Sequence, residues 1–166
     1  MAVAMDALDT RDSIDQDGHV DSSKMIQLIA FSLDDQVYGV EITTVREIRA
    51  WNGATPLPNT REFVRGVINL RGTIVPIFDL RARFGSGKTE ATKTHVVVVL
   101  SVGDKWVGML VDKVSDILTV NKDDIHAVPE GNSMDSELLG GIVTHENTMV
   151  GLIDLENVVG RSTEEA

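Results

Sequence analysis

The sequence predicts an all-β protein built from two copies of one small unit, and three observations lead to this fold class. Short segments rich in valine and isoleucine recur along the 166-residue chain, and several alternate apolar and polar residues as half-buried strands do. Gly, Asn, Asp and Pro separate these segments at close spacing, which is typical of a β-barrel or sandwich. Two blocks of sequence also recur without gaps, which indicates a duplicated unit.

Eight apolar segments are the predicted strands, taken in chain order. They span residues 25–33, 37–42, 66–70, 73–78, 95–100, 106–111, 141–143 and 149–155. Short helical turns are predicted at residues 59–64, where Asn59 or Thr60 provides a capping side chain, and at residues 134–139. The chain is thus mainly β, with a few short helices.

The internal repeat assigns these strands to two halves. The matched blocks are residues 35–48 with 104–117, an offset of 69, and residues 66–80 with 141–155, an offset of 75. Glycine, aliphatic and acidic positions coincide in both blocks, for example Gly39 with Gly108. We therefore expect one copy at about residues 25–90 and the other at about 91–160. Each copy is too small to be stable alone, so the two should share an interface.

The two ends of the chain differ in composition from this folded region. Residues 1–24 carry six aspartates and few large apolar side chains. Such a segment buries too little area to offset its chain entropy, so we expect a flexible acidic extension. Residues 161–166 are expected to form a solvated tail. The folded domain should therefore span residues 25–160.

Composition excludes several classes of function. The chain has no cysteine, so disulfides, thiolate metal sites and cysteine nucleophiles are ruled out. A formal net charge of −11 works against binding to nucleic acid or to an anionic membrane surface. The longest aliphatic run is far shorter than the roughly 20 residues of a membrane span. Because the N-terminus also lacks a signal-peptide pattern, we expect a cytoplasmic protein without membrane insertion.

Patterns that carry catalytic or metal chemistry are weak in this sequence. Residues 85–89, GSGKT, resemble the end of a phosphate-binding loop, but Ala82 stands where that pattern needs glycine, and a strand is expected to follow instead of a helix. The four histidines do not cluster at metal-ligand spacing. Asp79 and Asp154 fall on each other in the repeat, as turn-forming residues would. We therefore expect no enzymatic activity, no metal and no cofactor.

Arg71 is the residue that the repeat singles out. It lies in the stretch GVINLRG at residues 66–72, and the matching position in the second copy is Glu146. Since the two copies share the glycine, aliphatic and aspartate positions around it, those positions are explained by the fold. An arginine is not required by this turn, so Arg71 is a candidate for a functional role.

Three stretches of the chain resemble the CheW family of bacterial chemotaxis coupling proteins. They are residues 31–48, residues 56–85 and residues 108–117. The phrase GVINLRG-x-x-x-P-x-x-DLR, from Gly66 to Arg81, is the most specific part of the likeness. The resemblance covers about residues 26–160. Because these residues show no kinase or receiver pattern, we expect a stand-alone adaptor.

The resemblance implies a fold, a function and partners. The implied fold is a pair of five-stranded, SH3-like β-barrels packed together, which can exchange strands between the sequence halves. The implied function is that of a non-enzymatic adaptor, which couples the cytoplasmic tips of chemoreceptors to the histidine kinase CheA in membrane-associated signalling arrays. Other copies of the adaptor are further expected partners in rings. Two alternatives stay open: the same scaffold in another receptor–kinase pathway, for motility or second-messenger control, and a small-ligand-binding β-barrel.

An apolar groove between the barrels is the expected seat for a helical receptor tip. Val45 and Ile48, with Val114 and Ile117 at matching places in the second copy, either line this groove or belong to the ordinary core. The resemblance carries over Glu47 and Arg71 as receptor-side candidates, and we expect these two side chains to lie near each other at the groove mouth. The candidate receptor-binding residues are thus Val45, Glu47, Ile48, Arg71, Val114 and Ile117. Kinase contacts are expected at the end of one barrel, with no residues assigned.

Overall fold

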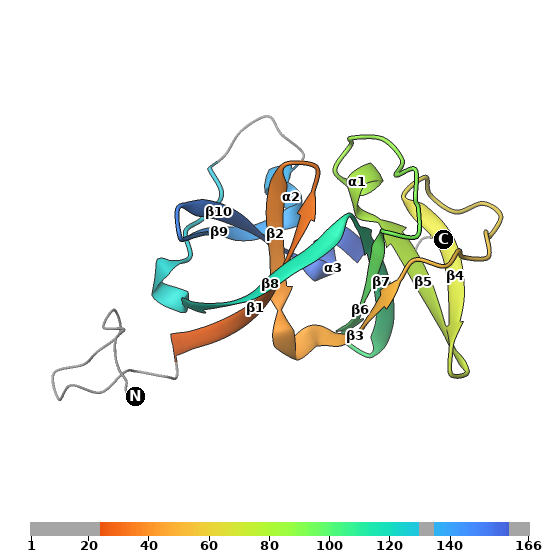
Figure 1. Cartoon of the computed structure of the whole chain (residues 1–166), viewed down its shortest axis with the longest axis horizontal. Coiled ribbons are helices and arrows are strands. Elements are labelled where there is room, and N and C mark those ends of the chain that lie inside the picture. Colours follow the sequence, from red (N-terminus) through yellow and green to blue (C-terminus); the bar gives the residue numbers. More distant parts are fainter. Residues whose placement is uncertain (1–23, 130–134, 160–166) are drawn as a thin grey trace, which may run out of the picture.

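The computed structural model describes residues 24–129 and 135–159, which form two five-stranded barrels side by side (Figure 1). The expected N-terminal extension, apart from Lys24, and the expected C-terminal tail lie outside the described residues. The strands are β1 (Met25–Leu33), β2 (Gln36–Glu41), β3 (Val45–Ala50), β4 (Val64–Leu70), β5 (Thr73–Asp79), β6 (Val96–Val102), β7 (Lys105–Val111), β8 (Lys113–Asn121), β9 (Leu139–His145) and β10 (Thr148–Ile153). The helices are α1 (Leu80–Arg83), α2 (Asp135–Leu138) and α3 (Leu155–Val159), with 3₁₀ turns η3 (Ile42–Thr44) and η4 (Lys122–Asp124).

The two barrels have equivalent strand orders. Each strand of one barrel corresponds to the strand of the other barrel whose number is five higher or five lower. Barrel 1 has the order β8-β1-β2-β10-β9, and barrel 2 has the order β3-β6-β7-β5-β4. Each barrel contains one parallel pair, β2 with β10 and β5 with β7, while its other neighbours are antiparallel. Each barrel therefore combines strands from both halves of the chain, so the copies exchange strands and neither half contains a complete barrel.

Each barrel is closed by a single backbone bridge at an equivalent place. After β3, Thr55 pairs with Val67 of β4, and after β8, His126 pairs with Ile142 of β9. Both bridges use two backbone hydrogen bonds, from 2.8 to 2.9 Å long. Val67 and Ile142 are matched in the sequence repeat, so closure belongs to the duplicated frame.

The hairpins β4–β5 and β9–β10 both turn through two residues in the left-handed region. In the first, Arg71 has φ 53° and Gly72 has φ 93°; in the second, Glu146 has φ 50° and Asn147 has φ 67°. Two-residue turns with positive φ at both positions match the twist of the flanking strands. Because Glu146 adopts the same conformation as Arg71, the arginine is not a requirement of the turn, in agreement with the sequence prediction.

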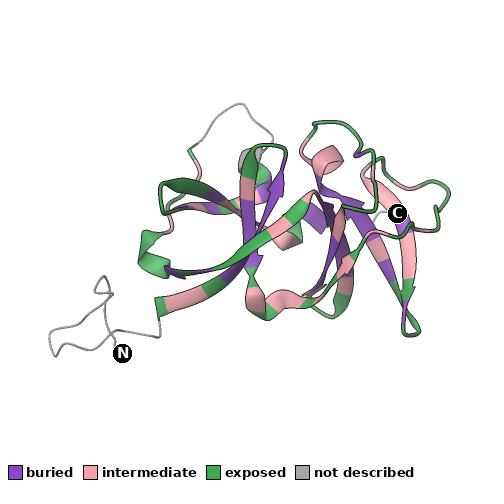
Figure 2. Cartoon of the chain, viewed as in Figure 1, coloured by how far each residue is buried: buried purple, intermediate pink, exposed green. Residues whose placement is uncertain are grey.

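Three apolar clusters make up the core. One fills barrel 1 (Leu28, Ala30, Leu118, Val120, Val143, Val150) and one fills barrel 2 (Leu70, Val75, Ile77, Val97, Val99, Leu110). The largest cluster joins residues of both barrels, including Phe31, Phe78 and Met109, each 0% exposed. Figure 2 shows this buried zone running across the middle of the molecule. The shared interface expected from the repeat is therefore a full hydrophobic core.

All eight predicted strands are present, and the mainly β, two-barrel fold class is confirmed. Strands β3 and β8 were not predicted, because both alternate charged and aliphatic residues on a largely exposed surface. The helix expected at residues 59–64 is wrong: Asn59 has φ 61°, which no right-handed helix accommodates, and only a turn forms there. The helix expected at residues 134–139 is present as α2. Within the described ranges, no helix is both long and apolar enough to span a bilayer.

Candidate functional site

Glu47 on β3 lies between two arginines. Its Oε1 accepts a hydrogen bond from an Nη of Arg71 at 2.7 Å, and its Oε2 accepts one from an Nη of Arg49 at 3.1 Å. The Glu47 side chain is 24% exposed, whereas that of Arg71 is 70% exposed. The predicted proximity of Glu47 and Arg71 is confirmed. Arg49 was missed, although residues two apart on a strand share a face and the alternation of β3 could have revealed it.

The two arginines change the electrostatics of Glu47. The hydrogen bond from Arg71 is the largest cause that lowers the pKa of the Glu47 carboxyl below its ordinary value of 4.5. The positive charges of Arg71 and Arg49 and the hydrogen bond from Arg49 lower this pKa further, against an opposing desolvation. Glu47 therefore stays ionised at neutral pH, and the trio carries a net single positive charge toward solvent.

The four candidate groove aliphatics fall into two pairs. Val45 and Val114 are partly buried and pack against the inter-barrel core. Ile48 and Ile117, matched in the repeat, are 44% and 50% exposed. Ile48 and Ile117 are thus exposed to solvent, while Val45 and Val114 border the filled interface.

A second pair of exposed apolar side chains was not anticipated. Ile74 on β5 is 59% exposed and Met149 on β10 is 62% exposed, and the two are repeat equivalents. Each is the second residue of the strand that follows its hairpin turn. The sequence contained a signal for this pair. Both copies carry a large apolar residue two positions after the two-residue turn, and the turn itself does not require one.

Asp79, considered above for carboxylate chemistry, has a structural role. It is 0% exposed and accepts hydrogen bonds from the backbone N–H and the hydroxyl of Thr89, each at 2.7 Å, and from Ala82 N–H at 3.3 Å. Arg65 pairs with it at 3.3 Å. These contacts hold the GSGKT loop against barrel 2. Strand β6 follows that loop, so the helix that a phosphate loop needs is not there.

A polar bridge links the two barrels beside this loop. Arg81 forms an ion pair with Asp34, which raises the pKa of the arginine, and Asp34 N–H donates to Asp112 at 2.7 Å. His95 Nε2 lies 3.5 Å from Asp112. The arginine of the DLR phrase therefore fixes barrel 1 against barrel 2.

Comparison with known proteins agrees with this architecture. The model of the CheW-like domain matches residues 27–162. The chain belongs to the CheW family. It is 43% identical to "Chemotaxis protein CheW" of Rhizobium meliloti (strain 1021), over 84% of this chain and 91% of that protein. It is 38% identical to "Chemotaxis protein CheW" of Klebsiella aerogenes, over 84% of this chain and 83% of that protein.

A solved CheW structure shares the fold. The scaffolding protein TtCheW from Thermoanaerobacter tengcongensis aligns with a TM-score of 0.74 and 31% identity, over 80% of this chain and 86% of that one. Membership of the CheW family gives the chain a chemotaxis adaptor role, as the sequence predicted. Its relatives are named as chemotaxis and scaffolding proteins, which agrees with a role that is not enzymatic.

Proposed function

We propose that this chain joins the cytoplasmic tips of chemoreceptors to the histidine kinase CheA, and that it catalyses no reaction itself. A coupling protein needs two surfaces on one rigid body, and two barrels fused by a common hydrophobic core meet this need. Signal transfer further requires that its contacts differ between two receptor states, since a ligand with equal affinity for both states shifts no equilibrium.

The surface around Arg71 and Glu47 is the proposed receptor side. The observation that carries this assignment is a difference between equivalent positions: barrel 2 presents Arg71 held on Glu47, whereas the matching residues of barrel 1 are two acids, Glu146 and Asp116. An exposed ion pair contributes only about 0–1 kcal/mol to folding. Charged groups at an interface contribute orientation and discrimination instead, and exposed Ile48 supplies an adjoining apolar contact.

The kinase side is proposed to use barrel ends. The resemblance implies that CheA carries a domain of the same fold, so packing can occur barrel to barrel. Exposed Ile74 and Met149 beside their hairpins are suitable apolar contacts for such packing. Modest contacts of this type gain strength in arrays, because each bound neighbour raises the effective concentration for the next.

Arg71→Glu tests the receptor assignment. We expect loss of co-sedimentation with receptor-bearing membranes at an unchanged melting temperature, because the side chain is exposed and contributes little to folding. The matched control is Glu146→Arg, which reverses a charge at the equivalent turn of barrel 1 and should leave receptor binding intact. Receptor binding by Arg71→Glu equal to that of the unmodified chain would refute the assignment.

Reconstitution tests the coupling role as a whole. Candidate CheA and receptor-bearing membranes are mixed with and without this protein, and CheA autophosphorylation is measured. We expect receptor control of the kinase only when the protein is present. Kinase activity that ignores its addition would contradict the proposal.

A further inference from the structure

The two barrels carry opposite charge. Residues 45–111, which contain the five strands of barrel 2, include ten Lys and Arg against five Asp and Glu, a net charge of +5. The segments that contain the strands of barrel 1, residues 25–44 and 112–159, include two Lys against thirteen Asp and Glu, a net charge of −11. On a chain that is acidic as a whole, barrel 2 is thus a basic body, and surfaces of this kind attract and orient oppositely charged partners.

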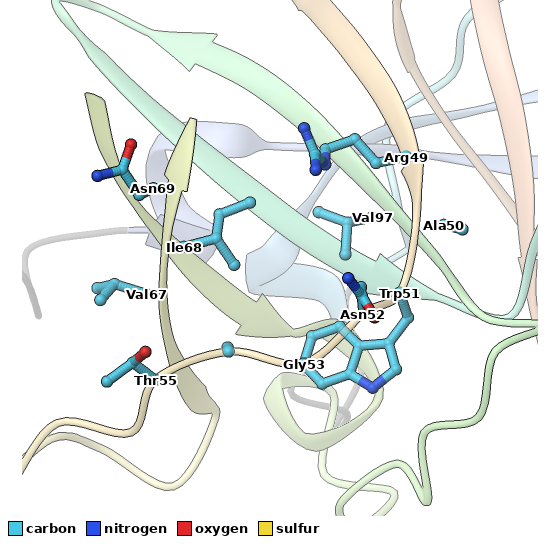
Figure 3. A pocket seen from close by; sticks show the side chains of 11 residues that line it. Arg49, Ala50, Trp51, Asn52, Gly53, Thr55, Val67, Ile68, Asn69 and Val97 are labelled. Carbon is cyan, nitrogen blue, oxygen red and sulfur yellow. The ribbon is translucent and has the colours of Figure 1, made fainter. Parts of the chain in front are cut away.

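A pocket of about 440 Å³ opens at the mouth of barrel 2, between the end of β3 and β4 (Figure 3). Arg49 and Asn69 face each other at its rim, and Ile68 and Val97 lie between them. Trp51 closes the lower side of the pocket in the same view. The pocket thus places the apolar side chains of Ile68, Val97 and Trp51 among polar groups and beside the Arg49 cation, which suits a group with a short apolar stem and an anionic end.

The rim groups are held in place by neighbours. Arg49 donates one Nη–H to Glu47, and its other N–H groups stay available for a ligand. Asn69 Oδ1 accepts from Gly72 N–H at 2.8 Å, which leaves the amide NH₂ as a donor. Arg65 stacks over the Trp51 ring at 5.3 Å and fixes the indole. These are hydrogen-bond donors on a preorganised frame, the arrangement that an incoming carboxylate needs.

A second opening adjoins the pocket along β3. Its lining shares Arg49, Ala50, Trp51 and Asn52 with the pocket and adds exposed Ile48, Lys93 and Glu47, whose carboxylate is paired with Arg49 and Arg71. Arg49 and Lys93 thus both line this surface, which is open to solvent and does not enclose a ligand.

Barrel 1 differs at its own closure. The residue before its closing bridge is Ile125, which packs into that barrel, whereas the residue before the bridge of barrel 2 is Ala54. The pocket near Ile125 is smaller, about 240 Å³, and has Glu41 in its lining. Ala54 lines the larger pocket of barrel 2 at the position where barrel 1 carries the bulkier Ile125.

We propose that the mouth of barrel 2 is a docking site for an acidic segment of a partner protein. One Glu or Asp carboxylate of that segment pairs with Arg49, its methylene stem lies against Trp51 and Ile68, and a neighbouring carboxylate reaches Lys93. The site adjoins the proposed receptor side, because Glu47 contacts both Arg49 and Arg71 and Ile48 borders both surfaces. Co-sedimentation of Arg71→Glu tests the receptor side, and the titration below tests the pocket, so failure of one proposal is distinguishable from failure of the other.

NMR of the full chain tests this site. The ¹H–¹⁵N spectrum, including the indole signal of Trp51, is recorded during titration with poly-L-glutamate at low salt. We expect shifts confined to Trp51, Asn69 and β3, weakening as salt is added because the contact is electrostatic. Poly-L-lysine should leave these signals in place. No shift at Trp51 with poly-L-glutamate would overturn the proposal.

Three variants distinguish binding at the pocket from attraction to the overall positive charge of barrel 2. Arg49→Gln should weaken poly-L-glutamate binding about tenfold, since it removes a charge-assisted hydrogen bond, and Ala54→Ile should abolish binding by filling the pocket as Ile125 fills barrel 1. Lys105→Gln removes an equal charge elsewhere on barrel 2 and should change little. Equal weakening by Lys105→Gln would overturn the site. Glutarate should bind far more weakly than the polymer, and binding of equal strength would overturn the assignment to a partner segment.

Discussion

The two barrels share a frame and differ in what they present to solvent. Strand order, parallel pairing, bridge closure and positive-φ hairpins recur in both. Arg71 and Glu47 of barrel 2, in contrast, are replaced by Glu146 and Asp116 in barrel 1. Duplication therefore accounts for the frame, and the exposed positions that the copies do not share account for partner choice.

Their closures also differ in strain. Gly66 of barrel 2 has φ +141°, and a Cβ there would lie 2.2 Å from the carbonyl oxygen of Thr55. Gly141, its repeat equivalent, would place a Cβ 2.6 Å from the Cγ2 methyl of Ile125 and 3.2 Å from the carbonyl oxygen of His126, without a positive φ. In barrel 2 a Cβ on Gly66 would collide with backbone atoms, whereas in barrel 1 the nearest atom to a Cβ on Gly141 belongs to the side chain of Ile125.

Gly66→Ala should be the most damaging change, at roughly 3–5 kcal/mol of unfolding free energy, because both the backbone conformation and the bridge oppose a Cβ. Gly141→Ala should cost about 1–2 kcal/mol, and adding Ile125→Ala should relieve its steric part. Urea denaturation followed by circular dichroism measures both losses. Equal losses for the two alanines would show that the closures are equivalent after all.

Substitution of the aspartates at the ends of β5 and β10 has the next largest expected effect on stability. Asp79→Ala removes a buried carboxylate, leaves the N–H and hydroxyl of Thr89 without their acceptor and takes the ion-pair partner from Arg65, so we expect a loss of about 3 kcal/mol. Asp154→Ala removes contacts to Asn157 at 3.2 Å in a more exposed setting, and should cost about 1 kcal/mol.

Hydrogen exchange adds a local measurement to the thermal or urea comparison of these two alanines. Asp79→Ala should speed exchange at Thr89, whereas Asp154→Ala should not. A smaller loss of stability for Asp79→Ala than for Asp154→Ala would contradict the structural role assigned to the buried network.

Much of the fold followed from local patterns, and the failures have physical causes. Apolar strands such as β6 were evident because both faces are buried, which gives a continuous aliphatic run. Edge strand β3 was missed because its alternating charges resemble a surface loop. The error at Asn59 arose because a capping residue and a polar run also describe a turn, and only the positive φ distinguishes them.

The site was less accessible to sequence reasoning. The repeat was sufficient to single out Arg71, and the alternation of β3 places Glu47 beside Arg49. The contact between Arg71 and Glu47, however, depends on the closure of barrel 2, which brings β3 beside the β4–β5 hairpin although β6 and β7 separate them in the strand order. The pocket beside Trp51 could not be predicted, because its lining comes from β3, β4 and β6 and the closure at Thr55, which only the folded chain brings together.

The smallest expected effect concerns the protonation of Glu47, the carboxylate of barrel 2 that accepts hydrogen bonds from Arg49 and Arg71. Since its folded pKa is lowered, the associated stabilisation is present above the unfolded value of about 4.5 and is lost as the pH falls through the folded pKa. Arg71→Ala should raise the pKa toward 4.5 more than Arg49→Ala does, because the Arg71 hydrogen bond is the larger cause. Carboxyl ¹³C NMR titration measures this shift. Identical Glu47 titration in all three proteins would mean that the arginines do not pair with it in solution, and the electrostatic distinction between the barrels would then rest on net charge alone.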